Sequence, residues 1–477
     1  MVFQPLVLSA VSLPATAYVI RSMGPSAYGQ WAIGMSLIGT VSVLTSLGLR
    51  PLFVRRVAQE LGMAREQMPY QFGLRGMLAM GAIAIVMVAC IFLRYPPIVL
   101  ACTAITALGL LLNTLGGVID DALNGLQRFK TQAMVNLTSG MVLTTLSVVA
   151  AWRGYGPLGI ALAYFAGPLT SITIFIFIAK RNNLPIIIRW NIRCFLDLLK
   201  DSRMVGFGYI IATIRDRSEQ LLVPKLVGIT DFGYFTAGTL LADRLTVIPS
   251  GLYGAFFPLI ARTYKDSPKL ASTHAALLIL ITLIVCLPIS IFITFLAQPI
   301  SMILFPKSAN ICREIIQITI WSLPFLAFLL CMGSSLQAIR AHNDGARAGI
   351  LTSIISFLAA IALIQQYGLI GACISWLIRP MIGFILFLPV FRRRLPSALS
   401  QVPIFRIMIC ASITAASLWS APLWLSSVVV LNLPLITIIS SFLALMVYIA
   451  SLFAFRLVNP SQLKWFITYR QVVSTET

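Results

Sequence analysis

Seven charged residues lie deep inside long apolar stretches of this sequence. Four of them follow one another in the segment "IRDRSEQLL": Arg215, Asp216, Arg217 and Glu219. At about 100° per residue on a helix, these four and Gln220 fill one arc of roughly 200°, and the opposite side is apolar. The pattern predicts a helix whose polar half lines a water-filled cavity. A structural alternative is that Arg215 and Glu219, spaced i, i+4, neutralise each other.

The other three charges are Asp243, Arg244 and Arg379, and each lies about 10 residues from the end of its apolar stretch. A charge at the centre of a bilayer costs about 2.5–3.5 kcal/mol or more, so it needs a cavity or a partner. The planar guanidinium group of arginine binds phosphate oxygens with two parallel hydrogen bonds. We therefore expect these seven residues to bind an anionic group, such as a phosphate or pyrophosphate, in a central cavity.

Few other residues could do chemistry. Arg50, Asp120 and Asp121 lie near the inner ends of their apolar stretches and are candidates for an inner gate. The eight cysteines and two histidines show no metal-ligand spacing. The sequence has neither a phosphate-binding Gly-Lys loop nor a convincing Ser-His-Asp grouping. We therefore expect no cofactor, no metal site and no enzymatic activity.

The composition indicates which solvent surrounds the elements that carry these charges. Of the 477 residues, 59% are hydrophobic and 10% are charged, whereas soluble domains carry about 25% charged residues. Lipid is therefore the solvent that suits this chain. The net charge of +21 comes from basic residues scattered over short loops, without the basic, aromatic-rich stripe of a nucleic-acid-binding protein. Nucleic acid is not expected as a partner.

Stretches of about 20 apolar residues can cross a bilayer as helices. Fourteen such spans are predicted, at residues 2–20, 30–54, 74–93, 97–119, 133–151, 157–179, 204–226, 232–258, 273–297, 311–338, 347–365, 369–390, 404–425 and 430–455. With both termini inside, the inner loops and tail hold 24 lysines and arginines and the outer loops hold 6. This distribution follows the positive-inside rule and predicts cytoplasmic termini. The first span follows Met1 directly, so we expect a membrane helix there rather than a cleaved signal peptide.

The sequence repeats itself. "RSMGPSAYGQW" (residues 21–31) matches "KLVGITDFGYF" (225–235) at an offset of 204, and "GPLGIALAYFAGP" (156–168) matches "GLIGACISWLIRP" (368–380) at an offset of 212. Six spans return the chain to the same side, which predicts two parallel six-helix lobes around a central cavity. The predicted parts are an N-terminal lobe (1–180), a basic amphipathic linker (181–203), a C-terminal lobe (204–391), two extra helices (392–458) and a cytoplasmic tail (459–477).

The two lobes differ in charge. At the same offsets, the positions of Arg215, Arg217, Asp243 and Arg379 are occupied in the first lobe by Val11, Leu13, Gly39 and Gly167. We therefore expect the substrate to be held mainly by the C-terminal lobe.

Several motifs, in this order and spacing, resemble a known family. They are R-x-M-G-P-x-x-Y-G-x-W-A at residues 21–32, "GLRPLFVRRVAQ" at 48–59, "ALNGLQRF" at 122–129, "VPKLVGITDFGYFTAG" at 223–238 and "PSGLYGAFFPLIAR" at 249–262. The chain resembles the polysaccharide transporter family, which holds the O-antigen and exopolysaccharide flippases of the multidrug, oligosaccharidyl-lipid and polysaccharide exporter superfamily. The likeness covers the first twelve spans, but the lead-in before the first span is shorter than is usual in that family.

The resemblance implies an inner-membrane flippase. Such a protein would move a polyprenyl-pyrophosphate-linked oligosaccharide repeat unit from the cytoplasmic to the periplasmic leaflet by alternating access. It would work with membrane lipid, a polysaccharide polymerase and chain-length machinery. One alternative is a drug/cation antiporter of the same fold, although the first lobe has no acidic residue at mid-depth. A membrane polysaccharide ligase or polymerase is a further alternative, although the predicted outer loops are short.

Overall fold

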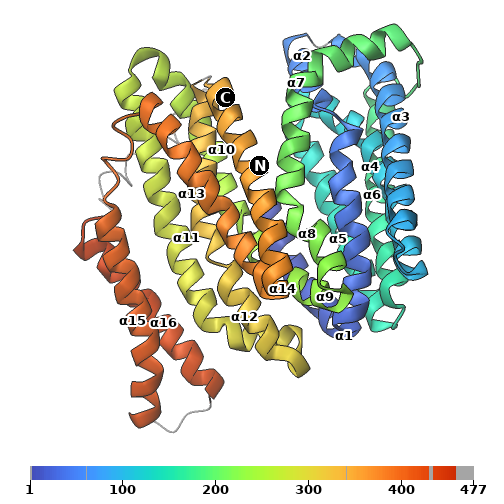
Figure 1. Cartoon of the computed structure of the whole chain (residues 1–477). Helices are drawn as coiled ribbons and strands as arrows, with labels where there is room; N and C mark the ends of the chain where they lie inside the picture. The colour runs from blue at the N-terminus through green and yellow to red at the C-terminus, as the bar shows by residue number, and fades with distance from the viewer. Residues whose placement is uncertain (1–2, 61, 340, 429–432, 458–477) are drawn as a thin grey trace. The chain divides into compact units, whose positions relative to one another are not determined.

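The computed structural model describes residues 3–60, 62–339, 341–428 and 433–457, and every element in these ranges is helical (Figure 1). The α-helices are α1 (Phe3–Val41), α2 (Leu49–Gln59), α3 (Met63–Phe92), α4 (Pro97–Gly125), α5 (Phe129–Trp152), α6 (Gly156–Arg181), α7 (Ile192–Asp216), α8 (Ser218–Leu226), α9 (Ile229–Leu245), α10 (Val247–Asp266), α11 (Pro268–Leu304), α12 (Ala309–Thr319), α13 (Ser322–Ala338), α14 (His342–Arg394), α15 (Ile404–Val428) and α16 (Leu433–Ala454). Two short 3₁₀ segments lie at Ser42–Thr45 and Pro306–Ser308. The predicted all-α membrane fold is confirmed.

The predicted spans coincide with these helices. Within the described residues, ten helices are long and apolar enough to cross a membrane, or eleven if α1 and α2, bent by 47°, form one span. This number is below fourteen because α1 with α2 and the single long α14 each cover two predicted spans. In addition, α7 and α8 hold the charged segment and do not qualify as an apolar span. The chain is a multi-pass membrane protein.

The long helix α14 is two antiparallel helices joined at Gly368. A straight helix of this length would measure about 80 Å, yet Arg394 Nη2 and Asp344 Oδ2, near its two ends, lie 2.6 Å apart. Gly368 has φ of 56° and ψ of −126°, in a region where glycine is favoured. A Cβ atom on Gly371 would lie 1.9 Å from the carbonyl oxygen of Leu363. The chain therefore turns back between the two predicted spans, 347–365 and 369–390.

The sequence repeat is also a repeat of backbone geometry. Gly156, the equivalent of Gly368 at the offset of 212, has φ of 62°. Gly24 and Gly228, equivalents at the offset of 204, have φ of 76° and 143°. Side chains rarely adopt such positive φ values. The repeated glycines therefore mark equivalent turns of the chain.

The two copies of the opening motif touch each other. A Cβ atom on Gly29 of α1 would lie 2.1 Å from the carbonyl oxygen of Ile229, and one on Gly233 of α9 would lie 2.0 Å from that of Pro25. Pro25 and Ile229 are equivalents at the same offset, so the contact is reciprocal, as in a two-fold symmetric interface. Only glycine allows the two helix backbones to approach this closely.

The chain divides into two compact units. The first comprises Met1–Arg244, Ser301–Ile315 and Ala346–Ile382, and the second comprises Leu245–Ile300, Ile316–Gly345 and Gly383–Thr477. All ten residues predicted for the site and the gate belong to the first unit. The lobe boundaries expected from the repeat stay a prediction, and the predicted tail, 459–477, lies outside the described residues.

Each unit has its own apolar core. In the first unit the core lies among α2, α3, α4 and α6, with buried side chains that include Phe53, Met68, Ile119, Leu123 and Phe175. In the second unit it lies among α10, α11, α13, α15, α16 and the end of α14, with buried side chains that include Phe256, Ile279, Met332, Phe391 and Leu452. Because lipid is as apolar as these side chains, close van der Waals packing holds such helices together in a membrane. The ion pair of Arg75 with Asp121 lies between α3 and α4, two helices of the first core.

The basic linker is an extended segment followed by the start of α7. The Asn191 side chain caps α7 by accepting hydrogen bonds from the backbone N–H groups of Arg193 and Cys194, at 3.1 and 3.2 Å. Ile188, Trp190 and Ile192 are largely exposed next to these basic residues. Apolar side chains beside arginines suit a membrane surface. The location of the linker on the inner membrane surface stays a prediction.

Candidate functional site

The charged segment lies at a break in a helix. α7 ends at Asp216 and α8 begins at Ser218, with Arg217 between them at φ of −112° and ψ of 6°. A helix end leaves backbone carbonyl groups without helical partners. Arg379 Nη1, from the second half of α14, donates to two of them, the carbonyl oxygens of Arg215 at 3.4 Å and Asp216 at 3.2 Å. The break thus draws a third segment of the chain to the site.

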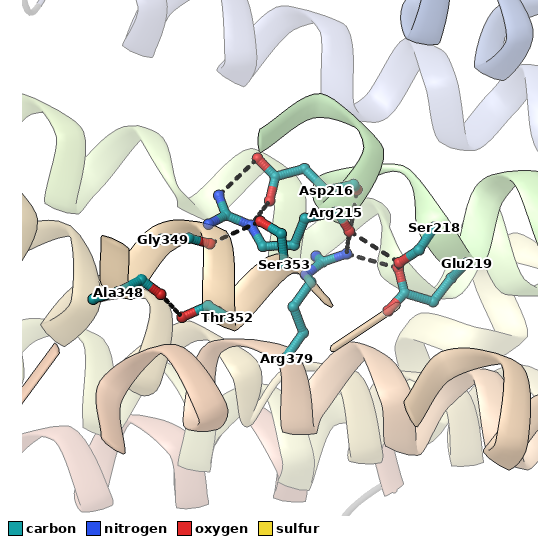
Figure 2. Close-up of polar contacts among 9 residues, drawn as sticks. All are labelled: Arg215, Asp216, Ser218, Glu219, Ala348, Gly349, Thr352, Ser353 and Arg379. Atoms are coloured by element: carbon teal, nitrogen blue, oxygen red, sulfur yellow. Dashed lines mark hydrogen bonds and ion pairs between the residues drawn. The ribbon is translucent and has the colours of Figure 1, made fainter. Parts of the chain in front are cut away.

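A buried ion pair fixes this arrangement (Figure 2). Arg379 Nη1 lies 2.7 Å from Glu219 Oε2, with side-chain exposures of 13% and 0%. Ser375 Oγ donates to Glu219 Oε1 at 3.0 Å, and Ser218 Oγ lies 3.0 Å from Glu219 Oε2. The Arg379 guanidinium stacks over the Trp376 ring at 4.4 Å. A buried pair needs such additional partners to offset its desolvation, and here both charges have them.

The remaining charges of the segment are less enclosed. Arg215 makes two hydrogen bonds to the exposed carboxylate of Asp216, at 2.8 and 3.3 Å. The alternative pairing of Arg215 with Glu219 is wrong, because the helix break separates them and Glu219 turns to Arg379. Arg217 donates to the side-chain oxygen of Gln220.

Asp243 and Arg244 join this group from the last turn of α9. Asp243 is exposed, and its charged neighbours are Arg379, Arg217, Arg244 and Glu219. The structure therefore brings together the seven residues that we name the junction cluster: Arg215, Asp216, Arg217, Glu219, Asp243, Arg244 and Arg379. Four arginines face three acidic residues, so the formal balance is positive. Such a group of partly exposed guanidinium groups can hold an anion with several oxygens.

The segment predicted as the first lobe contributes packing to this cluster at Gly39. Gly39 of α1 lies against the Arg217 side chain, and a Cβ atom on Gly39 would lie 3.2 Å from Arg217 Cζ. Gly39 is the equivalent of Asp243 at the offset of 204. Because glycine has no side chain, Gly39 leaves room for the Arg217 guanidinium group, which comes from the other copy of the repeat.

A second set of charges connects α2, α3 and α4. Arg50 Nε lies 2.8 Å from Asp121 Oδ1, and Arg50 Nη2 lies 3.4 Å from Asp120 Oδ2. Arg75 Nη1 lies 2.6 Å from Asp121 Oδ2, and Arg75 Nε donates to Gln71 at 3.0 Å. We name Arg50, Arg75, Asp120 and Asp121 the inner cluster. Its two arginines match its two aspartates in charge.

Sequence reasoning did not identify Arg75 as a site residue, because it lies at the very start of the span predicted at 74–93. α3 begins eleven residues earlier, at Met63, so Arg75 lies well inside it and is 3% exposed. Glu66 in the first turn of α3 was an available signal for the earlier start, since acidic residues favour helix N-termini. No local signal identified Ser375 as a partner of Glu219.

Comparison with known proteins agrees with this fold and these motifs. Residues 19–311, more than half of the chain, match the family described as "Polysaccharide biosynthesis protein". The chain belongs to this family. A protein of Shigella flexneri named "Putative O-antigen transporter" is 20% identical over 395 residues, which cover 79% of this chain and 92% of that protein.

Solved structures share the fold. The lipid II flippase MurJ, in an inward closed conformation, superposes with a TM-score of 0.74 at 16% identity, over 99% of this chain and 99% of that chain. An inward-facing multidrug resistance transporter of the MATE family superposes with a TM-score of 0.63 at 14% identity, over 84% of this chain and 99% of that chain. At this identity the likeness shows the fold, which is one used by membrane transporters.

Proposed function

We propose that this protein is a flippase that moves a polyprenyl-pyrophosphate-linked oligosaccharide repeat unit from the cytoplasmic to the periplasmic leaflet, for surface polysaccharide synthesis. The family assignment, the named Shigella relative and the fold shared with a lipid II flippase support this proposal. The observation that carries it is the junction cluster, in which a broken helix, α9 and α14 gather four arginines. Broken helices at mid-depth are recurrent binding sites in transporters.

The junction cluster suits the pyrophosphate group of such a substrate. Arg379 is committed to Glu219 and to carbonyl oxygens, so it fixes the scaffold. Among the described residues, Arg215 pairs with the exposed carboxylate of Asp216, and Arg217 donates to the amide oxygen of Gln220. Phosphate oxygens can replace these weak partners with charge-assisted hydrogen bonds. In this scheme, Arg215, Arg217 and Arg244 contact the substrate, Asp216 and Asp243 adjust the local charge, and the prenyl chain stays in lipid.

Alternating access requires a point about which the two lobes can move. The reciprocal contact of Gly29 with Gly233 joins equivalent positions of the repeat, which is where a two-fold axis relating the lobes would pass. We assign it the role of pivot and the inner cluster the role of a gate at the cytoplasmic side. Gly29→Ala should then reduce transport strongly while the protein still reaches the membrane. Normal transport by that variant would exclude the pivot.

The proposed location is the bacterial inner membrane with both termini in the cytoplasm, because the basic residues concentrate on one predicted side. The proposed partners are the lipid-linked substrate, membrane lipid, a polysaccharide polymerase and chain-length machinery. A drug/cation antiporter is the second candidate, favoured by the fold shared with the MATE transporter. The net positive junction cluster counts against a cationic substrate.

A deletion strain tests the proposal. Surface polysaccharide and extracted lipid-linked repeat units are measured in the deletion strain and after complementation with wild type, Arg215→Ala, Arg217→Ala or the matched control Arg153→Ala, an exposed arginine outside the cluster. We expect loss of surface polysaccharide, accumulation of complete repeat units, and rescue by wild type and Arg153→Ala alone. Normal polysaccharide together with raised drug accumulation would favour the antiporter. Normal transport but missing glycan transfer or chain growth would favour the ligase or polymerase.

A further inference from the structure

A small cavity lies within the first unit, among α1, α5, α6 and the last turn of α9. Its volume is about 210 Å³. Pockets for drug-sized ligands measure about 300–1,000 Å³. The cavity therefore has the scale of a single small ring, and α1, α5 and α6, whose arrangement Figure 1 shows, pack directly against one another.

One wall of the cavity is aromatic. Trp31 stands between Tyr28 and Tyr164, with ring centroids 5.3 and 4.9 Å from its own. The Trp31 side chain is 7% exposed, and among the described residues its indole Nε1 has no hydrogen-bond acceptor. A buried indole N–H normally has an acceptor. A ligand oxygen in the cavity would supply it.

Other residues that line the cavity offer hydroxyl oxygens. Thr16 Oγ1 donates to the carbonyl oxygen of Ser12 at 2.7 Å, and Thr144 Oγ1 to that of Gly140 at 2.7 Å. Ser147 Oγ likewise donates to the carbonyl oxygen of Leu143 at 2.8 Å. Because each hydroxyl proton is already used within its helix, the lone pairs remain as acceptors. The cavity thus combines an unused donor with several acceptors, the complement of a ring with many hydroxyl groups.

Arg244 connects the cavity with the junction cluster. It lines the cavity, lies near both Tyr28 and Tyr164, and is a charged neighbour of Asp243. Aromatic rings attract organic cations, but a guanidinium group in the same cavity repels them. It would instead attract a carboxylate on an acidic sugar or the nearest phosphate.

We propose that this cavity is a monosaccharide subsite, which holds the sugar ring next to the phosphate while the pyrophosphate contacts the junction cluster. The inference rests on the proposed function for the identity of the transported molecule. It assigns to the N-terminal lobe a neutral, hydroxyl-recognising role that the charged C-terminal residues lack. Trp31 and Thr144 are the residues expected to discriminate between rings.

Ligand-detected NMR tests the subsite directly. Saturation transfer from the full-length protein in lipid nanodiscs is measured to the methyl glycosides of glucose, galactose, mannose, N-acetylglucosamine and glucuronic acid. We expect at least one glycoside to bind, and Trp31→Phe, which keeps an aromatic ring but removes the N–H donor, to weaken it about tenfold. Thr144→Val, of the same shape, should weaken it several-fold. Trp419→Phe, in an exposed position on α15, should bind like wild type.

Three outcomes would overturn the subsite. They are binding by none of the glycosides, equal binding by wild type and both cavity variants, and displacement of the bound glycoside by tetraphenylphosphonium, which would indicate a cation site. Melting temperatures of the variants separate lost binding from lost folding. If a glycoside binds but the deletion strain makes normal polysaccharide, the subsite stands and the flippase function is rejected. If no glycoside binds but the deletion strain loses surface polysaccharide and accumulates repeat units, the flippase function stands and the subsite is rejected.

Discussion

The inner cluster and the junction cluster contain the same kinds of ions but use them differently. In the inner cluster the central carboxylate of Asp121 is 2% exposed and touches both arginines. In the junction cluster the enclosed pair is that of Glu219 with Arg379. Arg215, Arg217, Asp216 and Asp243 keep accessible surface. Ion pairs inside a membrane protein can therefore serve either to join helices or to leave charge available for a ligand.

The difference arises from the elements that carry the charges. Asp120 and Asp121 lie on the uninterrupted helix α4, and their partners come from neighbouring helices α2 and α3. The junction charges lie at the break between α7 and α8, where carbonyl oxygens also need partners. A continuous helix can present a carboxylate to a fixed pair of arginines, whereas a break spreads charges over several directions.

Asp121→Ala should be the most destabilising change. It leaves the Arg75 guanidinium buried without its carboxylate, and removing one partner of a buried ion pair typically costs about 3–5 kcal/mol. The measurement is the melting temperature of the detergent-purified protein, together with its yield in membranes. Arg50→Ala is the matched control, since Arg50 is 58% exposed and should lower stability by less than about 1 kcal/mol. Equal losses in the two variants would show that Asp121 does not join the helices.

Glu219→Ala should rank second, with a loss of about 2–3 kcal/mol. The loss should be smaller than for Asp121→Ala because Arg379 retains the two carbonyl oxygens and the Trp376 ring. A double-mutant cycle with Arg379→Met measures the pair itself, and we expect a coupling of at least about 1 kcal/mol. Additive effects in that cycle would mean that the pair contributes no interaction of its own.

The sequence predicted the spans and the repeat well, because both depend on local composition. Hydrophobic stretches coincide with the ten described helices that are long and apolar enough to cross a membrane, and repeated glycines marked the turns at Gly156 and Gly368. The breaks at Arg217, at Thr246 and before Ser322 were not predicted, since hydropathy averages over an interruption of one or two residues. Helix periodicity across residue 217 consequently gave a single polar face that the structure does not contain.

The partners of the site charges were less predictable. Glu219 is bound by Arg379, 160 residues away in the sequence, whereas spacing pointed to the nearby Arg215. Such a pairing depends on tertiary packing, which no local pattern contains. The grouping of all seven charges was nevertheless expected from their shared depth, because isolated charges are costly in lipid. Whether they contact substrate stays a prediction.

Arg215→Ala should cause the third-largest loss of stability. It should also show most clearly that the junction cluster acts in transport whereas the inner cluster joins helices. Its ion pair with Asp216 is partly exposed, so the free energy of unfolding should fall by less than about 1 kcal/mol. Transport should nevertheless fall at least tenfold, as loss of one charge-assisted contact to the substrate implies. Repeat-unit accumulation in the complemented deletion strain measures transport, with membrane yield as the control. Full transport by this variant would mean that Arg215 does not contact the substrate and has a structural role, like the arginines of the inner cluster.

Gly39→Ala should have the smallest effect on stability and the most local effect on the junction cluster. The new methyl group would lie 3.2 Å from Arg217 Cζ, so the flexible guanidinium group must shift by a few tenths of an ångström. The gain in helix propensity of about 0.5–1 kcal/mol should offset this crowding, and the melting temperature should stay close to that of wild type. If Arg217 binds the pyrophosphate, transport should still fall several-fold, because the guanidinium group is displaced from its binding position. Gly76→Ala, which meets only a Leu115 methyl group at 3.6 Å, is the matched control and should transport normally. Equal transport by both variants would mean that the position of Arg217 does not matter, and the functional difference between the clusters would then depend on Arg215 and Arg244.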